Sequence, residues 1–412
     1  MAEIQALEYN QLVLRKKPVL LGFLLAVVFF LLPMYIFPSG SYQLVDIAMI
    51  FVLIAAFCYR EALNKELSRQ LTPLIPFVIW VFSINGLRFI TDPEDYWYLL
   101  ASAVIFYGVV LAFCFSILFK KLLDNQDQLS FLYIALFLSV IGCFLVSGYD
   151  EAGFEIGRRI DLSFNNPNQL AYFAILLLSY TILLMKIKLL YKKTLLYTIM
   201  DIFFILTAYF FILLTMSRAG ALSMGILTLY LIISMRSWKI YLPGILAILL
   251  SLFYITYINP AFFQERIETR HKGHWSTKEM MFGPTGLSVR VLEPFAAFKG
   301  ADLIWGKGAA ALEKREESGL FLGPRKGVME VHNMFMSVLL SYGLIGLVLF
   351  GYWLARFIRY TLSLRDGKWI MAALILYNFA HNGIRFRSFW IFLAFLNVVI
   401  YLANQANKNA ET

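Results

Sequence analysis

A histidine stands where the long hydrophilic stretch of this chain meets an apolar helix. The hydrophilic stretch runs from about residue 259 to 330, and His332 and Asn333 follow it just before the apolar sequence that begins at Met334. The positive end of a helix macrodipole disfavours an imidazolium ion, so we expect His332 to be neutral near physiological pH. A neutral imidazole can accept a proton and act as a general base. The structural alternative is a histidine that only caps a helix at the membrane surface.

Two arginines have the chemistry to hold an anionic group. Arg218 lies between two long apolar runs, which predicts a tight turn where a charge is costly and therefore functional by default. Arg290 lies in residues 287–298, whose apolar side chains recur at helical spacing and predict a segment along the membrane surface. Guanidinium groups bind phosphate oxygens through paired hydrogen bonds. The structural alternatives are a snorkelling Arg218 and a solvated Arg290.

Glycine and asparagine mark other local features. Gly343 and Gly346 follow His332 in the same apolar run and would permit close helix packing. Residues 305–308, Trp-Gly-Lys-Gly, resemble a phosphate-cradling turn but lack the spacing of a P-loop, so we interpret them as a simple turn. Asn168 follows an Asn-Pro turn signal, and we predict that it caps the next helix.

The composition predicts an integral membrane protein. Of its 412 residues, 60% are hydrophobic and 15% charged, whereas a soluble domain is about 45–50% apolar. The three cysteines lie in apolar runs and have no disulfide or metal-ligand spacing. The acidic residues of segment 92–95 are interpreted as a solvated turn, so we expect neither metal nor cofactor. The net charge of +10 comes from basic residues at the ends of apolar runs, which indicates membrane topology rather than nucleic-acid binding.

Apolar runs near the length that crosses a bilayer predict an all-α polytopic membrane protein of about twelve helices. Nine helices are expected in residues 1–258, a large and partly helical loop in 259–330, and three helices with a cytoplasmic tail in 331–412. The expected spans lie near 19–37, 43–59, 72–90, 97–119, 129–148, 168–186, 195–216, 219–235, 240–258, 332–354, 368–383 and 387–404.

The basic residues of the short connections set the orientation. With the N-terminus in the cytoplasm, most Lys and Arg residues of these connections fall on the inner side, as the positive-inside rule requires. The long loop 259–330 and both candidate arginines then lie outside, with both termini inside. The short outer connections carry only Arg88, Arg158, Arg159, Arg218, Arg385 and Arg387.

Two short motifs resemble those of the bacterial O-antigen ligases. One is His332-Asn333, followed after nine residues by Gly343 and after two more by Gly346; the other is Arg218-Ala219-Gly220-Ala221-Leu222. That family likewise has twelve helices in the bacterial inner membrane and a large periplasmic loop before the motif histidine. Arg290 is similar to the family pattern by its place in this loop.

The resemblance implies a glycosyltransferase of the GT-C type with its active site facing the periplasm. The donor would be a polysaccharide on undecaprenyl pyrophosphate, and the acceptor a sugar hydroxyl of lipid A–core in lipopolysaccharide assembly. Transfer would be inverting and metal-independent. His332 would be the catalytic base, Arg218 and Arg290 would hold the donor pyrophosphate, and Asn333, Gly343 and Gly346 would support the site.

Other functions fit the same residues. An O-antigen or exopolysaccharide polymerase and a protein O-oligosaccharyltransferase would use the same donor with a different acceptor. A transporter or flippase would be expected to place charged residues in the middle of its spans. The main ionisable residues inside apolar runs are Asp46 and Asp201, and both lie near predicted ends, which argues against transport.

The predicted topology is tested by cysteine labelling in intact cells. In a background without Cys58, Cys114 and Cys143, a cysteine replacing Ser276 in the long loop should react with a membrane-impermeant maleimide. A cysteine replacing Ser237, in a predicted cytoplasmic connection, should react only after the inner membrane is opened. Protection of the cysteine at position 276 in intact cells would overturn the orientation.

Overall fold

The fold is helical throughout the residues described by the computed structural model. These are residues 19–36, 43–93, 97–124, 128–145, 162–164, 166–190, 195–215, 217–234, 300–309 and 333–411. No β-strand occurs among them. The predicted span 240–258, most of the 259–330 loop, and residues His332 and Arg290 lie outside the described residues.

The described helices follow the apolar runs of the sequence. The N-terminal part contains α2 (Val19–Leu31), α3 (Leu44–Cys58), η1 (Arg60–Ala62), α4 (Lys65–Leu71), α5 (Leu74–Thr91), α6 (Trp97–Leu123) and α7 (Leu129–Leu145). The middle part contains α8 (Pro167–Leu190), α9 (Leu195–Thr215), α10 (Arg218–Ser234) and the short α15 (Asp302–Trp305). The C-terminal part contains α16 (Met334–Thr361), α17 (Arg365–Asn378), η6 (Gly383–Arg385) and α18 (Arg387–Glu411).

Length and hydropathy identify a polytopic membrane protein. Among the described residues, six helical stretches are long and apolar enough to cross a bilayer: 65–91, 98–123, 167–188, 195–215, 334–361 and 387–406. Helices α2, α3, α7 and α10 are also apolar but shorter. The structure therefore confirms the class of fold, while the count of twelve spans stays a prediction.

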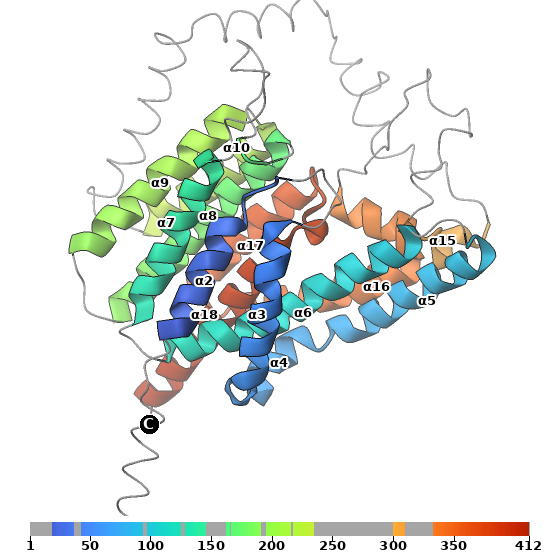
Figure 1. Ribbon diagram of the computed structural model, residues 1–412, viewed down its shortest axis with the longest axis horizontal. Helices are drawn as coiled ribbons and strands as arrows, with labels where there is room; N and C mark the ends of the chain where they lie inside the picture. Colours follow the sequence, from blue (N-terminus) through green and yellow to red (C-terminus); the bar gives the residue numbers. More distant parts are fainter. Residues whose placement is uncertain are drawn as a thin grey trace, which may run out of the picture.

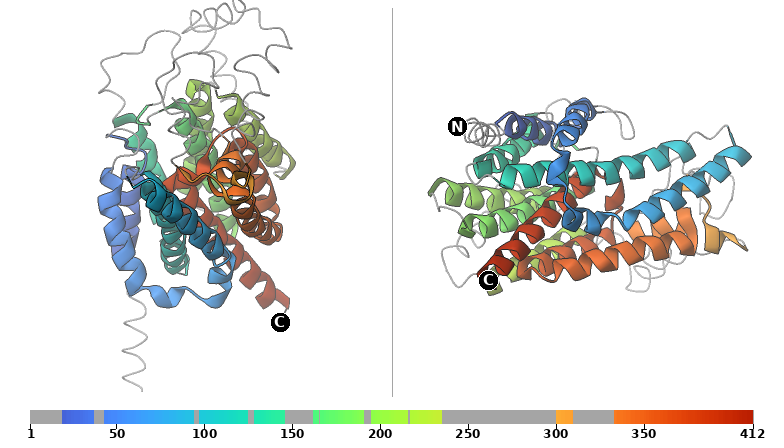
Figure 2. Two further views of the ribbon diagram at one scale, coloured as in Figure 1. Left: turned by 90° about the vertical axis from the view of Figure 1, so that its right-hand side faces the viewer. Right: turned by 90° about the horizontal axis from the view of Figure 1, so that it is seen from below.

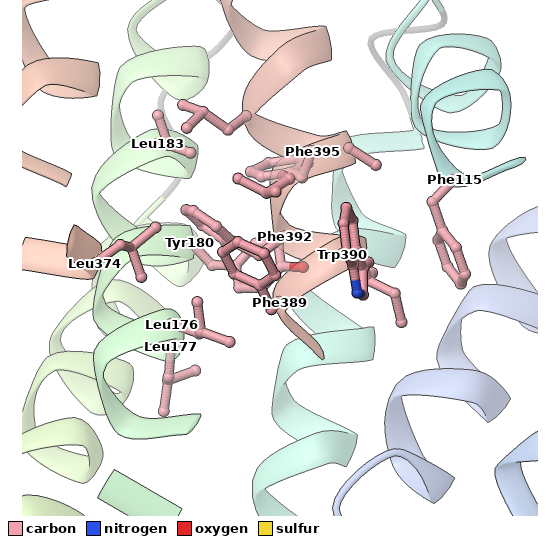
Figure 3. Close-up of a cluster of buried hydrophobic side chains, with 14 of the residues drawn as sticks. Phe115, Leu176, Leu177, Tyr180, Leu183, Leu374, Phe389, Trp390, Phe392 and Phe395 are labelled. Atoms are coloured by element: carbon pink, nitrogen blue, oxygen red, sulfur yellow. The ribbon is translucent and has the colours of Figure 1, made fainter. Parts of the chain in front are cut away.

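Helix α8 lies at the centre of one group of helices. Its apolar residues surround the whole helix, and they are buried over most of its length, as expected for a helix enclosed by others. It packs against α9, α10, α17 and α18. Figure 3 shows Tyr180 of α8 beside Phe392 and Phe395 of α18, with ring centroids 4.9 and 5.1 Å away.

A second group of helices extends away from the first. Helices α5, α6 and α16 run side by side, and α15 lies at their far end (Figures 1 and 2). The two groups are joined where α18 packs against α6. There Gly108 leaves room for the indole of Trp390, whose Nε1 would lie only 2.2 Å from a Cβ added at position 108.

Buried carboxylates tie neighbouring helices together. Asp46, in the first turn of α3, accepts hydrogen bonds from Arg387 of α18 at 2.7 Å and from the Tyr107 hydroxyl of α6 at 3.0 Å. Asp201 of α9 pairs with Lys188 of α8 and accepts from the Tyr133 hydroxyl at 2.9 Å. Both aspartates thus have structural partners on adjacent helices, and Arg387 is committed to one of them.

One cap differs from the sequence prediction. Helix α8 begins at Pro167, and the side-chain oxygen of Asn166 accepts from the backbone N–H of Gln169 at 3.0 Å. Asn166 therefore caps the helix, and the prediction of Asn168 was wrong. Proline is favoured at the first helical position, because its missing N–H needs no partner there, and this moves the cap to the preceding asparagine.

Removing the Asp46 carboxylate should destabilise the protein far more than removing an exposed one. Asp46→Ala leaves the largely buried Arg387 without its counter-ion, which should cost about 3 kcal/mol of unfolding free energy. Asp124→Ala breaks the Lys120–Asp124 pair, whose carboxylate is exposed, and should cost less than about 1 kcal/mol. Thermal unfolding of the two variants in detergent measures the difference, and equal losses would contradict the structural role of Asp46.

Candidate functional site

Arg218 lies in the tight turn that the sequence predicted. Helix α9 ends at Thr215 and α10 begins at Arg218 itself. The Ser217 hydroxyl accepts from the backbone N–H of Gly220 at 3.2 Å and so caps α10. The Arg218 side chain is exposed and makes no hydrogen bond or ion pair within the described residues. An exposed guanidinium at a helix N-terminus, where the macrodipole is positive, is well suited to an anionic ligand.

Gly220 allows the helices behind this turn to come close together. A Cβ added at Gly220 would lie 3.0 Å from Cδ1 of Ile212 on α9 and 3.2 Å from Cβ of Ala171 on α8. A larger residue would push α10 away from both neighbours. The glycine of the Arg218-Ala219-Gly220 sequence therefore holds the start of α10 against the central helix.

Helix α16 is broken at Gly343. This residue has φ +68° and ψ −172°, which divides the helix into residues 334–342 and 344–361. Asn333 caps the first half, because its side-chain oxygen accepts from the N–H groups of Phe335 at 2.9 Å and Met336 at 3.0 Å. Sequence reasoning expected Gly343 to provide close helix packing. The structure adds the break as a second role, since glycine adopts this backbone conformation without strain.

The segment after α15 docks against the turn that precedes the break. The backbone N–H of Lys307 donates to the carbonyl of Leu340 at 3.1 Å, and that of Gly308 to the carbonyl of Ser341 at 2.9 Å. The indole of Trp80 on α5 donates to the carbonyl of Tyr342 at 2.8 Å. These donors satisfy carbonyls beside an irregular backbone, as an apolar environment demands.

Both glycines at this contact are needed for the approach of the two backbones. A Cβ on Gly306 would lie 2.4 Å from the Ser341 carbonyl oxygen, and a Cβ on Gly343 would lie 2.2 Å from that of Ile304. The N–H groups of Lys307 and Gly308 point to α16, so residues 305–308 do not cradle a phosphate. Gly346 packs near Trp80, whose Cδ1 would be 3.3 Å from an added Cβ, which agrees with the predicted close packing.

Residues 302–309 are also hydrogen-bonded to α5. Arg88 donates to the carbonyl of Gly306 at 2.9 Å and to the Asp302 carboxylate at 3.1 Å. The backbone N–H of Ala309 donates to the side-chain oxygen of the fully buried Asn85 at 3.1 Å. Residues 301–309, which belong to the part of the long hydrophilic stretch that the structure describes, are thus held by both α5 and α16.

Two polar residues that sequence reasoning did not select lie in the short segment between α17 and η6. His381 and Asn382 follow α17, and each is about 98% buried. The Asn382 amide donates to the Ser337 hydroxyl at 3.0 Å, while its oxygen is buried without a partner among the described residues. The interruption of an apolar run by His-Asn-Gly was the signal in the sequence, but it does not reveal a contact with a residue 45 positions away.

Helix α17 connects the two parts of the candidate site. It packs against α10, which starts at Arg218, and against α16, which starts after Asn333. At the C-terminal end of α17, the ring centroid of Phe379 lies 4.8 Å from that of Phe335. Arg218 and Asn333 therefore stand at the starts of two helices that pack against α17, whereas Gly343 and Gly346 face α15 and α5. His332 and Arg290 lie outside the described residues. Among the described residues no group of three or more His, Cys, Asp and Glu side chains could hold a metal ion.

Part of this chain matches a protein-family model. Residues 202–351 match the family model described as O-antigen ligase. This region begins within α9 and ends within α16, so it contains all the candidate residues selected from the sequence: Arg218, Arg290, His332, Asn333, Gly343 and Gly346. No curated protein matches the chain.

Gly343→Ala should disturb the site, whereas Gly351→Ala in the same helix should not. Alanine at position 343 meets the Ile304 carbonyl and a backbone conformation that costs about 1–3 kcal/mol for a residue with a Cβ. No atom lies within 4 Å of a Cβ added at Gly351, and alanine is favoured over glycine within a helix. We expect a lower unfolding temperature for Gly343→Ala alone, and a parental unfolding temperature of both variants would show that the break is dispensable.

Proposed function

We propose that this chain, which belongs to the O-antigen ligase family by its match over residues 202–351, transfers a polysaccharide from a lipid-linked diphosphate to a membrane-anchored sugar. The polytopic helical fold agrees with a membrane glycosyltransferase of this family. The observation that carries the proposal is the coincidence of the matched region with Arg218, Arg290 and the His332-Asn333 sequence. The finer features proposed are an undecaprenyl pyrophosphate donor, a lipid A–core acceptor and a site on the periplasmic side of the inner membrane.

Arg218 is proposed to bind the donor diphosphate, with Arg290 as its second cation. The exposure of Arg218 and the lack of an ion-pair partner among the described residues support this role. Arg88 and Arg387, by contrast, are paired with Asp302 and Asp46. Paired hydrogen bonds from guanidinium to phosphate oxygens would stabilise the charge that grows on the leaving group.

His332 is proposed to remove the proton from the acceptor hydroxyl. The hydroxyl oxygen then forms a bond to the anomeric carbon, while the bond from that carbon to the diphosphate oxygen breaks on the opposite face, which inverts the configuration. The proton passes to the imidazole, and undecaprenyl pyrophosphate leaves as the anion. Two arginines supply the charge that a metal ion would otherwise provide, so the reaction is proposed to be metal-independent.

Asn333 is proposed to act by fixing the start of α16. Its side-chain oxygen already accepts two backbone N–H groups of that helix, and is therefore committed to the cap. Gly343 and Gly346 act further along the same helix, by forming the break and by admitting Trp80. The supporting residues thus hold the helix that directly follows His332.

Transfer by the purified protein in nanodiscs tests this proposal. Lipid A–core and a second lipid-linked glycan are offered as competing acceptors for a glycan on undecaprenyl pyrophosphate, in the presence of EDTA. Glycan attached to lipid A–core is the expected product. Extension of the lipid-linked glycan would identify a polymerase, transfer to protein an oligosaccharyltransferase, and donor binding without any product would contradict an enzymatic function.

Arg218→Lys should be severely impaired in transfer. Lysine keeps the positive charge but loses the fork-shaped pair of donors that matches a phosphate, so we expect a fall in rate of about 10²-fold or more. The matched control is Arg356→Lys, a partly exposed arginine on a long helix, where the structure shows only a 3.5 Å contact with the Tyr352 hydroxyl. Near-parental transfer by Arg218→Lys would remove the diphosphate contact from the mechanism.

His332→Ala should lower turnover without abolishing donor binding. A general base contributes about 10²–10⁴-fold to rate, and the loss should be of that size per folded molecule. The parental rate should fall as pH decreases through the titration of the histidine, because the protonated ring cannot accept a proton. A histidine that only caps the helix predicts a less stable alanine variant whose folded molecules turn over normally.

A further inference from the structure

We propose that the cavity between α5 and α15 is a binding site for one neutral sugar ring of the transferred glycan or of its acceptor. This inference rests on the proposed glycosyltransferase function and adds a place for a sugar remote from the reacting atoms. The cavity is lined by Ile84, Leu87, Arg88, Thr91, Ala301, Asp302, Trp305 and Gly306.

The size of the cavity restricts its occupant. Its volume is about 240 Å³, below the range of about 300–1,000 Å³ that is typical of sites for drug-sized ligands. It has room for a small ring rather than for a chain of several rings. Its walls are mostly apolar, with a few polar groups at one side, which is the usual arrangement for recognising a small polar molecule.

The polar groups favour a neutral hydroxylated ligand over a phosphate. Asp302 lies 3.1 Å from Arg88 and 3.9 Å from the ammonium of Lys307, so the charge of the cations is partly compensated. The carboxylate weakens, without cancelling, the attraction of these two cations for an anion. A sugar hydroxyl both donates and accepts hydrogen bonds, and therefore suits a site that offers a carboxylate beside a guanidinium.

The aromatic wall adds a surface for the apolar face of a sugar ring. Trp305 stacks on Trp80 of α5 with 5.7 Å between ring centroids, and the side chain of Trp305 remains 49% exposed. The Trp80 indole is fixed in turn by its hydrogen bond to Tyr342. The half-exposed indole of Trp305 offers an apolar contact to a pyranose ring. The Asp302 carboxylate and the Arg88 guanidinium beside it offer a hydrogen-bond acceptor and donors for its hydroxyl groups.

The cavity is joined to the helix that follows the proposed base. Lys307 and Gly308, directly after Trp305 and Gly306, hydrogen-bond to Leu340 and Ser341 of the first half of α16. At 1.5 Å per residue, Leu340 lies about 10 Å along the helix from Asn333. A sugar bound here would contribute affinity and orientation rather than chemistry, since binding of remote parts of a substrate positions its reacting end.

Saturation-transfer NMR on the full-length protein in nanodiscs tests the site without any turnover. The probes, tested separately, are the oligosaccharide released from lipid A–core and the polysaccharide released from its lipid carrier. We expect one of them to bind, about tenfold more weakly to Trp305→Ala, and with nearly parental affinity to Trp305→Phe, which keeps a ring. Leu303→Ala is the control, because Leu303 is exposed on the same short helix and does not line the cavity.

Kinetics identify which substrate supplies the sugar. Trp305→Ala should raise the KM for the substrate whose glycan binds and leave kcat close to the parental value. Equal binding of both probes to Trp305→Ala and Leu303→Ala would overturn the site, as would competition by phospholipid headgroups instead of glycan. If the parental protein binds the glycan but does not transfer it, this result would contradict the proposed function and not this site.

Discussion

The need to satisfy backbone hydrogen bonds in an apolar environment is the constraint on which the contact between α15, α16 and α5 depends. Helix α16 is interrupted at Gly343, and an interrupted helix can lie at membrane depth only where other groups supply the partners. Here these are two N–H groups of residues 307–308 and the indole of Trp80. The break therefore couples α16 to α5 and to residues 307–308 of the long hydrophilic stretch.

This coupling places several functions in one structural unit. The first half of α16 follows His332 and contacts Asn382 through Ser337. The docked segment carries Trp305 and Asp302, which line the cavity against α5. A change at either glycine of the contact would consequently reach the start of α16 and the proposed sugar site together.

Counter-ions are distributed unevenly among the arginines Arg88, Arg218 and Arg387, and this distribution separates structural from functional candidates. Arg387 joins α18 to α3 through Asp46, and Arg88 joins α5 to α15 through Asp302. Arg218 has no such counter-ion among the described residues. A guanidinium without a counter-ion at the positive end of a helix retains its full attraction for a phosphate. In a paired guanidinium, the carboxylate already neutralises the charge and occupies hydrogen-bond donors.

The sequence by itself determined the features that depend on neighbouring residues. Apolar runs predicted the helices because a helix in lipid satisfies its own backbone, and the short interval at Arg218 predicted the tight turn between α9 and α10. Only the tertiary structure decided that Gly343 breaks its helix, because a glycine in an apolar run fits close packing equally well. The pairings Arg88–Asp302 and Asn382–Ser337 join residues far apart in the chain. Such contacts depend on how the helices pack, and residue types and spacing alone do not specify them.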